Sequence, residues 1–447
     1  MPTRGGDRDY QAGLATVLRE WGRIGVTGFG GPPTHIALLR KLCVDSRGWL
    51  DAAEFEDAIA ACNLLPGPAS TELAIFCAWR VRGRLGAIIG GLAFIVPGLI
   101  VILFLAALFL AGSPPLWVRG AGAGAGAAVA AVAVQAGWML LVPSWKRATA
   151  RDAGTAGRDA GTGGPDAGTG GPDAGTAGPD AGSTGPDAGS TGRARAARIR
   201  WTAYLVAGGV SAATIGPWLV LVLLGCGLFE TAVRQRGRAG PRHWRWPGRW
   251  PGRRPAGMAA IAPLFPAVGG GVLASVAWVA FKVGALSFGG GFVIIPLMQA
   301  DAVGRHWMTG AQFLNAVALG QITPGPVVQT VAAVGYAAAG LPGGLLASAV
   351  AFTPSFAFVL AGGRYFSRLR GNRYAQSFLD GSGPAAIGAI LGSAIPLARE
   401  LSVGWQFAVL AGAAVLLLAL RRGVVLTLLS AAATGVLIAL AGGPLPG

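Results

Sequence analysis

Long stretches without a single charged side chain alternate along this chain with short stretches that carry most of its charge. Each uncharged stretch matches or exceeds the ~20 residues that a helix needs to cross the apolar core of a bilayer. The pattern therefore predicts an all-α, polytopic membrane protein rather than a set of soluble domains. The uncharged stretches are 85–118, 120–145, 201–229, 255–281, 306–363, 401–420 and 423–447.

The composition supports a membrane protein and argues against several other classes. Hydrophobic residues make up 53% of the chain and charged residues only 12%, about half the ~25% of an average soluble domain. The net charge of +17 arises from basic loops between apolar stretches, so we interpret it as a marker of membrane orientation and expect no nucleic-acid partner. Four cysteines without paired spacing indicate neither a disulfide framework nor a zinc site.

A seven-residue unit that begins with Asp-Ala-Gly is repeated six times over 152–193. It contains no aromatic residue and no Leu, so this segment lacks the apolar side chains that a folded core requires. We predict a disordered linker over 146–200 that separates two halves of the protein. A helix pair at 201–233 and a basic cytoplasmic loop at 234–257 are expected to follow it.

The two halves repeat each other. The Gly-Val-Thr-Gly-Phe-Gly-Gly motif at 25–31 corresponds to Gly-Ala-Leu-Ser-Phe-Gly-Gly at 284–290, and Pro-Gly-Pro at 66–68 corresponds to Pro-Gly-Pro at 324–326. The offset between matching residues falls only from 259 to 257 across these and the following motifs, so two single-residue gaps align the copies. The chain is therefore an internal duplication.

Arginine distribution predicts how the copies are oriented. Three Arg residues lie in 80–84, whereas the matching loop at 337–342 has none, and the loop at 364–373 carries four where its counterpart has one. This reversal predicts two inverted-topology repeats, at 1–145 and 258–447. The number of membrane crossings agrees with this inversion only if the Phe-Gly-Gly segments form re-entrant hairpins. Both termini are then expected on the outer side.

Pro-Gly-Pro inside an apolar stretch predicts a broken helix. Proline lacks the backbone N–H and disfavours helical geometry in the residue before it, so a new helix begins after each motif. A helix N-terminus at membrane depth presents N–H donors and a positive dipole end to an anion. Breaks at matched positions of two repeats point to a transporter's binding site. A kink or a tight helix crossing is the structural alternative for a single motif.

Charged residues in the apolar stretches are candidates for function because they are costly to bury there. Arg23 and Lys282 each precede a Phe-Gly-Gly motif by six residues, and snorkelling to the interface is their alternative role. Glu72 would repel an anion, but it could carry a proton. We predict no catalytic or metal-ligating residue and no cofactor. The candidate substrate-binding residues are Arg23, Phe29, Gly30, Gly31, Pro66, Gly67, Pro68, Ser70, Thr71, Lys282, Ser287, Phe288, Gly289, Gly290, Gln321, Thr323, Pro324, Gly325 and Pro326.

At these motifs the chain resembles the chromate ion transporter family. The matching motifs are FGGP at 29–32, LLPGPASTELAI at 64–75, GALSFGGGFVIIPL at 284–297 and GQITPGP at 320–326. The resemblance spans about 14–110 and 270–362. It implies an exporter of chromate from the cytoplasm, linked to the proton-motive force, that confers chromate resistance, with sulfate as the natural look-alike. One departure is Glu72, where the resemblance leads us to expect Gln.

We therefore predict a multi-pass plasma-membrane protein, not an enzyme, that exports the tetrahedral chromate oxyanion by alternating access. Its expected partners are chromate, sulfate as a competing anion, and the lipid bilayer; a homodimer is compatible with the sequence. One alternative is transport of another small anion, such as sulfate, or of a small metabolite. A remote alternative is an intramembrane lipid-phosphate enzyme, for which Glu72 has no evident catalytic partner in the sequence.

Overall fold

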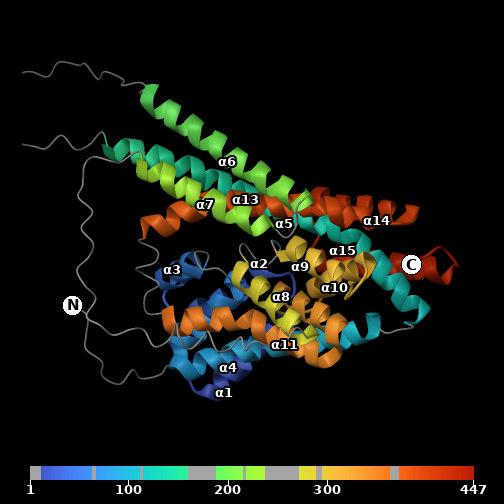
Figure 1. Cartoon of the computed structure of the whole chain (residues 1–447). Coiled ribbons are helices and arrows are strands. Elements are labelled where there is room, and N and C mark those ends of the chain that lie inside the picture. The colour runs from blue at the N-terminus through green and yellow to red at the C-terminus, as the bar shows by residue number, and fades with distance from the viewer. Residues whose placement is uncertain are drawn as a thin grey trace, which may run out of the picture.

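The computed structural model describes residues 12–62, 67–110, 114–159, 188–214, 218–236, 271–287, 294–362 and 372–446. For 147–159, 188–194 and Arg236, only the path of the backbone is described. Regular secondary structure across these ranges is entirely helical. Figure 1 shows the helices gathered into one elongated bundle.

Described helices lie on both sides of the boundary that the sequence predicts between the two halves. The first half contains α1 (Leu14–Thr27), α2 (Pro32–Arg40) with a π-helical turn at Lys41–Ser46, α3 (Ala52–Cys62), α4 (Ala69–Phe109), α5 (Leu116–Asp159), α6 (Ala188–Thr214) and α7 (Leu219–Arg236). The second half contains α8 (Val272–Leu286), α9 (Ile294–Gly304), α10 (Gly310–Ile322), a 3-10 turn at Val327–Gln329, α11 (Thr330–Gly362), α13 (Arg373–Arg399), α14 (Gly404–Ala414) with a π-helical turn at Val415–Ala419, and α15 (Val424–Leu440).

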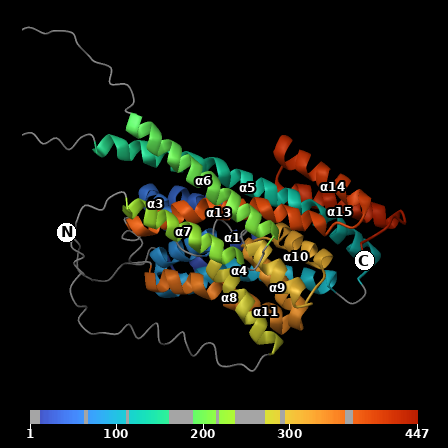
Figure 2. The ribbon, with the colours of Figure 1, turned by 45° about the horizontal axis from the view of Figure 1, so that its top comes forward.

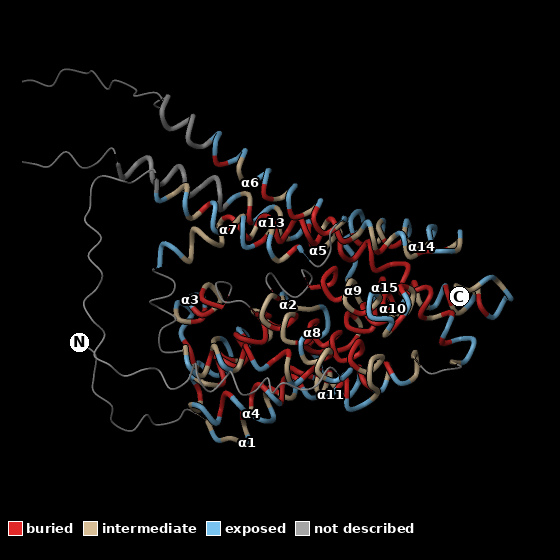
Figure 3. The backbone as a smooth tube through the Cα atoms, in the orientation of Figure 1, coloured by how far each residue is buried: buried red, intermediate tan, exposed pale blue. Residues whose placement is uncertain are grey.

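Several helices are suited to a lipid environment. Within the described residues, four segments are long and apolar enough to cross a bilayer: Ala69–Phe109, Leu116–Lys146, Val327–Gly362 and Arg373–Arg399. Large apolar side chains point outward from the bundle, and Phe104 and Leu437 are each 69% exposed. Figure 3 shows buried residues along the interior of the bundle and exposed residues on its outer surface. The all-α polytopic fold is thus confirmed.

The helices that follow the two Pro-Gly-Pro motifs, α4 and α11, bend at equivalent places. In α4 the chain leaves helical geometry at Arg82 and Gly83, where Gly83 has φ 66° and ψ −154°. In α11 it does so at Ala339 and Gly340, where Gly340 has φ 63° and ψ −154°. Positive φ of this kind favours glycine. Each helix therefore consists of a short arm before the bend (69–81 or 330–338) and a long arm after it (84–109 or 341–362).

The long arms of α4 and α11 pack against each other in opposite directions. A Cβ added at Gly91 would touch the ring of Phe356, and one added at Gly344 would touch the side chain of Leu103. Interpolation between these contacts places Ile95 opposite Phe352, which is the equivalent residue of the other copy. Equivalent helices that cross antiparallel at equivalent residues have the geometry of a two-fold axis perpendicular to them.

The C-terminal parts of the two halves pack mainly against the opposite half. α5 lies against α15 and α14, whereas α13 lies against α6 and α7 (Figure 2). Glycines bring these backbones close together, because a Cβ at Gly120 would collide with the carbonyl of Gly435 and one at Gly124 with the carbonyl of Ala431. Such small-residue contacts are typical of helices that associate within membranes. The two halves therefore share an extensive helix–helix interface.

The helices extend further into the predicted linker than the sequence suggested. α5 continues to Asp159 and α6 begins at Ala188, so both ends of the predicted disordered segment 146–200 are helical. These flanks are rich in Ala and Arg, which are strong helix formers. Residues 160–187, and nearly all of the predicted basic loop at 234–257, lie outside the described residues.

The expectation that both termini lie on the outer side stays a prediction. α15 ends toward the end of the bundle opposite to the one from which α5 and α6 project (Figure 1). Within the first half, α3 packs against α4.

Candidate functional site

The second Pro-Gly-Pro motif separates α10 from α11 with an extended segment. α10 ends at Ile322, Thr323 is extended with φ −79° and ψ 146°, and Gly325 has φ 94°. The helical path resumes after Pro326, which supplies no side-chain cap. The first N–H groups after the break therefore lack intrahelical acceptors, and the positive end of the helix dipole lies at the break.

The first Pro-Gly-Pro motif is described from its glycine onward. Gly67 and Pro68 are buried, and α4 begins at Ala69 without a side-chain cap. The carbonyl of Pro68 accepts hydrogen bonds from the amides of Thr71 and Glu72 at 2.8 and 3.1 Å. The arrangement again leaves the first amides of a helix without intrahelical acceptors. Both breaks thus present an uncapped helix N-terminus inside the protein.

The hairpin tip of the first half meets the break of the second half. The amide of Gly325 donates to the carbonyl of Gly28 at 3.1 Å, and the ring Nε2 of His35 donates to the same carbonyl at 2.9 Å. A Cβ at Gly31 would lie 3.6 Å from Val327. The glycines around Phe29 therefore allow the two motifs to approach through their backbones.

Each long arm also faces the break of the opposite half. The facing residue directly follows a proline of the long arm: Gly98 follows Pro97, and Ser355 follows Pro354. A Cβ at Gly98 would collide with the carbonyl of Pro324 and lie 2.5 Å from Oε1 of Gln329. At the equivalent position of the second half, Oγ of Ser355 lies 3.2 Å from the Cβ position of Gly67. The amide of Gln329 donates to the carbonyl of Ile95 at 2.5 Å. The two breaks are therefore held at the centre of the antiparallel long arms.

Buried polar atoms without a hydrogen-bond partner gather at this centre. Apart from Ser211 on α6, every such atom among the described residues belongs to a break, to the hairpin next to it or to the long arm beneath it. Unpartnered buried polar groups are costly and normally indicate a bound ligand or water. The atoms are His35 Nδ1, Thr71 Oγ1, Glu72 Oε1 and Oε2, Ser287 Oγ, Gln321 Nε2, Gln329 Oε1 and Ser355 Oγ.

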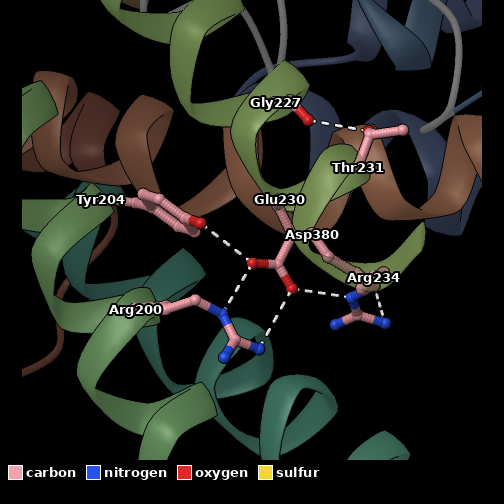
Figure 4. Close-up of polar contacts among 7 residues, drawn as sticks. All are labelled: Arg200, Tyr204, Gly227, Glu230, Thr231, Arg234 and Asp380. Carbon is pink, nitrogen blue, oxygen red and sulfur yellow. Dashed lines mark hydrogen bonds and ion pairs between the residues drawn. The ribbon is translucent and has the colours of Figure 1, made fainter. Parts of the chain in front are cut away.

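A second polar cluster, where α6, α7 and α13 meet, has the opposite character (Figure 4). The carboxylate of Glu230 accepts hydrogen bonds from Arg200 at 2.9 Å, Tyr204 at 2.9 Å and Arg234 at 2.7 Å. Arg234 also pairs with Asp380 of α13 at 3.1 Å. Because the carboxylate is fully partnered, this cluster stabilises the packing of the helices. The unpartnered donors at the breaks are the better candidates for a binding site.

The sequence of the chain matches a known protein family. The family model described as chromate transporter matches residues 15–231 and 274–436, which together cover most of the chain. This chain belongs to the chromate transporter family. Membership implies a transporter rather than an enzyme, and a multi-pass membrane protein, which in a bacterium resides in the plasma membrane.

Curated relatives are similar over most of their length. The chromate transport protein of Cupriavidus metallidurans is 29% identical over 89% of this chain and 85% of its own. The chromate transport protein of Pseudomonas aeruginosa is 28% identical over 84% and 79%, and a probable chromate transport protein of Synechococcus elongatus is 25% identical over 85% and 83%. No solved structure matches this chromate transporter family member.

The structure of this chromate transporter family member brings most of the predicted binding residues together at the two breaks. The residues at the breaks and their hairpins are buried, except Gly31, which is half-buried. Of the other predicted residues, Phe29 is 44% exposed and Gly30 is exposed. Pro66, Phe288, Gly289 and Gly290 lie outside the described residues. The residues at the breaks and their hairpins are Gly31, Gly67, Pro68, Ser70, Thr71, Ser287, Gln321, Thr323, Pro324, Gly325 and Pro326.

The two predicted cations of the transporter have other surroundings. The ammonium group of Lys282 lies 2.5 Å from the carboxylate of Asp301 and 5.9 Å from the ring centre of Trp278. Lys282 is the only charge in its apolar stretch of sequence, but it is paired in the structure because Asp301 of α9 lies next to it. Arg23 is exposed on α1, while Ile24 and Gly25 beside it are buried. A substrate-binding role for either cation stays a prediction.

Sequence reasoning left four residues of the site out of the predicted set: His35, Gly98, Gln329 and Ser355. Gly98 and Ser355 had a detectable signal, because each follows a proline at an equivalent position of the two copies. Nothing in the sequence indicates that these positions face the break of the opposite half. The contact between His35 and Gly28 likewise depends on how the hairpin folds.

Proposed function

We propose that this protein transports chromate, that it exports chromate from the cytoplasm, and that it thereby confers chromate resistance. The observation that carries the proposal is the pair of uncapped helix N-termini, surrounded by unpartnered buried polar atoms, at the centre of the antiparallel long arms. Family membership and the names of the curated relatives support chromate as the substrate.

The chemistry of the breaks suits a tetrahedral oxyanion. Such an ion offers four oxygen atoms as acceptors, and helix N-termini bind anions through N–H groups and the helix dipole. Hydroxyl and amide donors at Thr71, Ser287, Gln321 and Ser355 have no other partner among the described residues. Neutral donors of this kind hold an anion without the strong charge pairing that would retard its release.

The symmetry of the site supports alternating access between two inverted halves. The long arms cross antiparallel, with Gly91 against Phe356 and Gly344 against Leu103, and each arm faces the break of the opposite half. In the proposed mechanism, rocking of one half about this crossing opens the site first to one side of the membrane and then to the other. The kinks at Gly83 and Gly340 separate the short arms that carry the breaks from the long arms.

The membrane potential can drive export of this substrate. One charge that crosses 100 mV gains about 2.3 kcal/mol, so a dianion that leaves a negative interior gains about 4.6 kcal/mol. At about 1.4 kcal/mol per decade of concentration, this sustains roughly a thousandfold gradient. Export therefore requires no chemical energy source besides the potential.

The decisive test is uptake of labelled chromate into inverted membrane vesicles, with and without energisation and with sulfate as competitor. Energy-dependent accumulation that exceeds the accumulation in vesicles without the protein is expected. Absence of accumulation, with correct insertion demonstrated, would overturn the proposal. Accumulation of sulfate with exclusion of chromate would retain anion transport and overturn the substrate. Growth of cells on chromate with and without the protein tests resistance separately.

A further inference from the structure

The first break contains a buried acid that the second break lacks. Glu72 lies in the first turn and a half of the α4 short arm, and its equivalent in the second half is Thr330. The Thr330 hydroxyl donates to the carbonyl of Val327 at 2.8 Å. The Glu72 side chain, by contrast, is fully buried, and neither carboxylate oxygen has a hydrogen-bond partner among the described residues.

The carboxyl group of Glu72 lies inside the first break. A Cβ at Gly67 would collide with Oε1 of Glu72 and would lie 3.2 Å from Oγ of Ser355. The hydroxyls of Ser355 and Thr71 are also buried without a described partner. The carboxyl group of Glu72 and the hydroxyls of Thr71 and Ser355 therefore lie around Gly67 at the first break. Ser355 comes from the second half of the protein.

No described cation offsets a charge on Glu72. The two arms of α4 pack against α1, α2, α3, α5, α10, α11 and the 3-10 turn at Val327–Gln329. α10, α11 and that turn contain no charged residue, and Arg119 and Lys146 of α5 are exposed. An unpaired buried carboxylate is strongly unfavourable, so the acid is protonated in this conformation. The other charged groups around α4 are paired or exposed. Glu20 pairs with Arg47, Glu54 with Arg80, Glu56 with Arg40 and Lys282 with Asp301. Asp57 and Arg82 have partners of their own, and Arg23 and Arg84 are exposed. His35 is hydrogen-bonded to the carbonyl of Gly28, and Cys62 is a buried thiol.

We propose that Glu72 binds a proton that crosses the membrane together with the oxyanion, in the same direction. The inference rests on the proposed function and deepens it. An ionised Glu72 would repel a dianion held at the neighbouring break, whereas the protonated acid exerts no such repulsion and offers an O–H donor. Proton and oxyanion therefore bind together on one side and leave together on the other.

The proton balance of this step is simple. The carboxylate takes one proton from water on the loading side and returns it to water on the opposite side, and no bond to the anion forms. One proton with one dianion leaves a net charge of one negative unit, so the membrane potential still drives the pair outward. The second break, which has Thr330 in place of the acid, contributes neutral donors to the anion alone.

The test uses the purified full-length protein in liposomes that contain a pH indicator dye, at mildly alkaline pH, where chromate is a dianion. Chromate is added outside, and chromate entry and internal pH are followed together, without sodium and then with it. For the unaltered protein, chromate entry is expected to acidify the interior. In Glu72→Gln, chromate entry is expected to slow because the O–H donor is lost, and the chromate that enters should leave the internal pH at the baseline of protein-free liposomes. Glu56→Gln, which removes an exposed carboxylate of α3, should behave like the unaltered protein.

Three results would overturn the inference while leaving chromate transport intact: internal alkalinisation, a sodium requirement without proton movement, or unchanged acidification in Glu72→Gln. If Glu72→Gln does not fold, Glu72→Asp takes its place, since it keeps the acid on a shorter side chain. Glu72→Asp should acidify the interior more slowly, with the same number of protons per chromate as the unaltered protein. A lower number of protons per chromate would overturn the inference. Absence of chromate entry with the unaltered protein would instead refute the proposed function.

Discussion

The amide of Gly325 donates a hydrogen bond to the carbonyl of Gly28 at 3.1 Å. This bond joins the broken helix of the second half to the hairpin tip of the first half. Gly325 has φ 94°, a conformation that other residues rarely adopt, so a glycine is needed for its amide to reach Gly28. Any motion of one half relative to the other must either carry this pair as a unit or break the bond.

Replacement of Gly98 by Ala should impair transport, because the new methyl group would collide with the Pro324 carbonyl. Overpacking of this kind typically costs about 1–3 kcal/mol. We expect chromate uptake to fall several-fold and thermal unfolding in detergent to shift to lower temperature. Gly412→Ala is the matched control, since no atom lies within 4 Å of that Cβ position. Equal uptake by the two variants would show that Gly98 does not support the break.

Replacement of Gln321 by Met should weaken chromate binding. Its amide nitrogen is buried without a described partner, and a hydrogen bond to a charged ligand contributes about 1.5–3 kcal/mol. The KM for chromate should therefore rise at least about tenfold, with membrane abundance unchanged. Gln299→Met serves as control, because that amide already donates to Glu400 at 3.1 Å. A normal KM in Gln321→Met would remove Gln321 from the site.

The Lys282–Asp301 pair can be tested by a double-mutant cycle. Removal of Asp301 leaves the partly buried Lys282 unpaired, and removal of Lys282 leaves Asp301 only its 3.6 Å contact with Arg305. Both changes are destabilising. Lys282→Met and Asp301→Asn should each reduce the amount of folded protein in the membrane, and the double variant should recover most of it. If the double variant is abundant but inactive, Lys282 contributes to transport beyond its pairing with Asp301.

Replacement of Glu230 by Ala should destabilise the protein without changing its affinity for chromate. The substitution removes the acceptor that Arg200, Tyr204 and Arg234 share, at a cost of about 2 kcal/mol or more. We expect a lower midpoint of thermal unfolding and an unchanged KM in the protein that remains folded. A raised KM at normal stability would instead assign this cluster a role in transport.

Replacement of 160–187 by a Gly-Ser segment of equal length should preserve transport. The natural segment contains no large apolar side chain that could pack against the helices, and equal length keeps the ends of α5 and α6 connected without strain. Chromate uptake per inserted molecule should match that of the unaltered chain. Loss of uptake in a normally inserted variant would show that the seven-residue repeats have a function of their own.

The sequence by itself determined the features that depend on local covalent geometry and on apolar length. Uncharged stretches of sufficient length indicate membrane helices, and Pro-Gly-Pro predicts a helix break wherever it occurs, because proline cannot donate the helical hydrogen bond. The two copies were recognisable from matched motifs alone, and the structure describes equivalent bends at Gly83 and Gly340. Arg and Lys residues, however, could not be assigned to partners from their spacing.

Only the tertiary structure decided which parts of the two halves face each other. Gly98 and Ser355 approach the opposite break, and Asp301 approaches Lys282, because helices that are distant in the chain pack antiparallel and bring these residues into contact. Such contacts depend on packing across the whole bundle and have no signature in a local window of sequence. The same packing buries Glu72 away from every described cation, and this burial distinguishes an acid that can carry a proton from an ordinary surface charge.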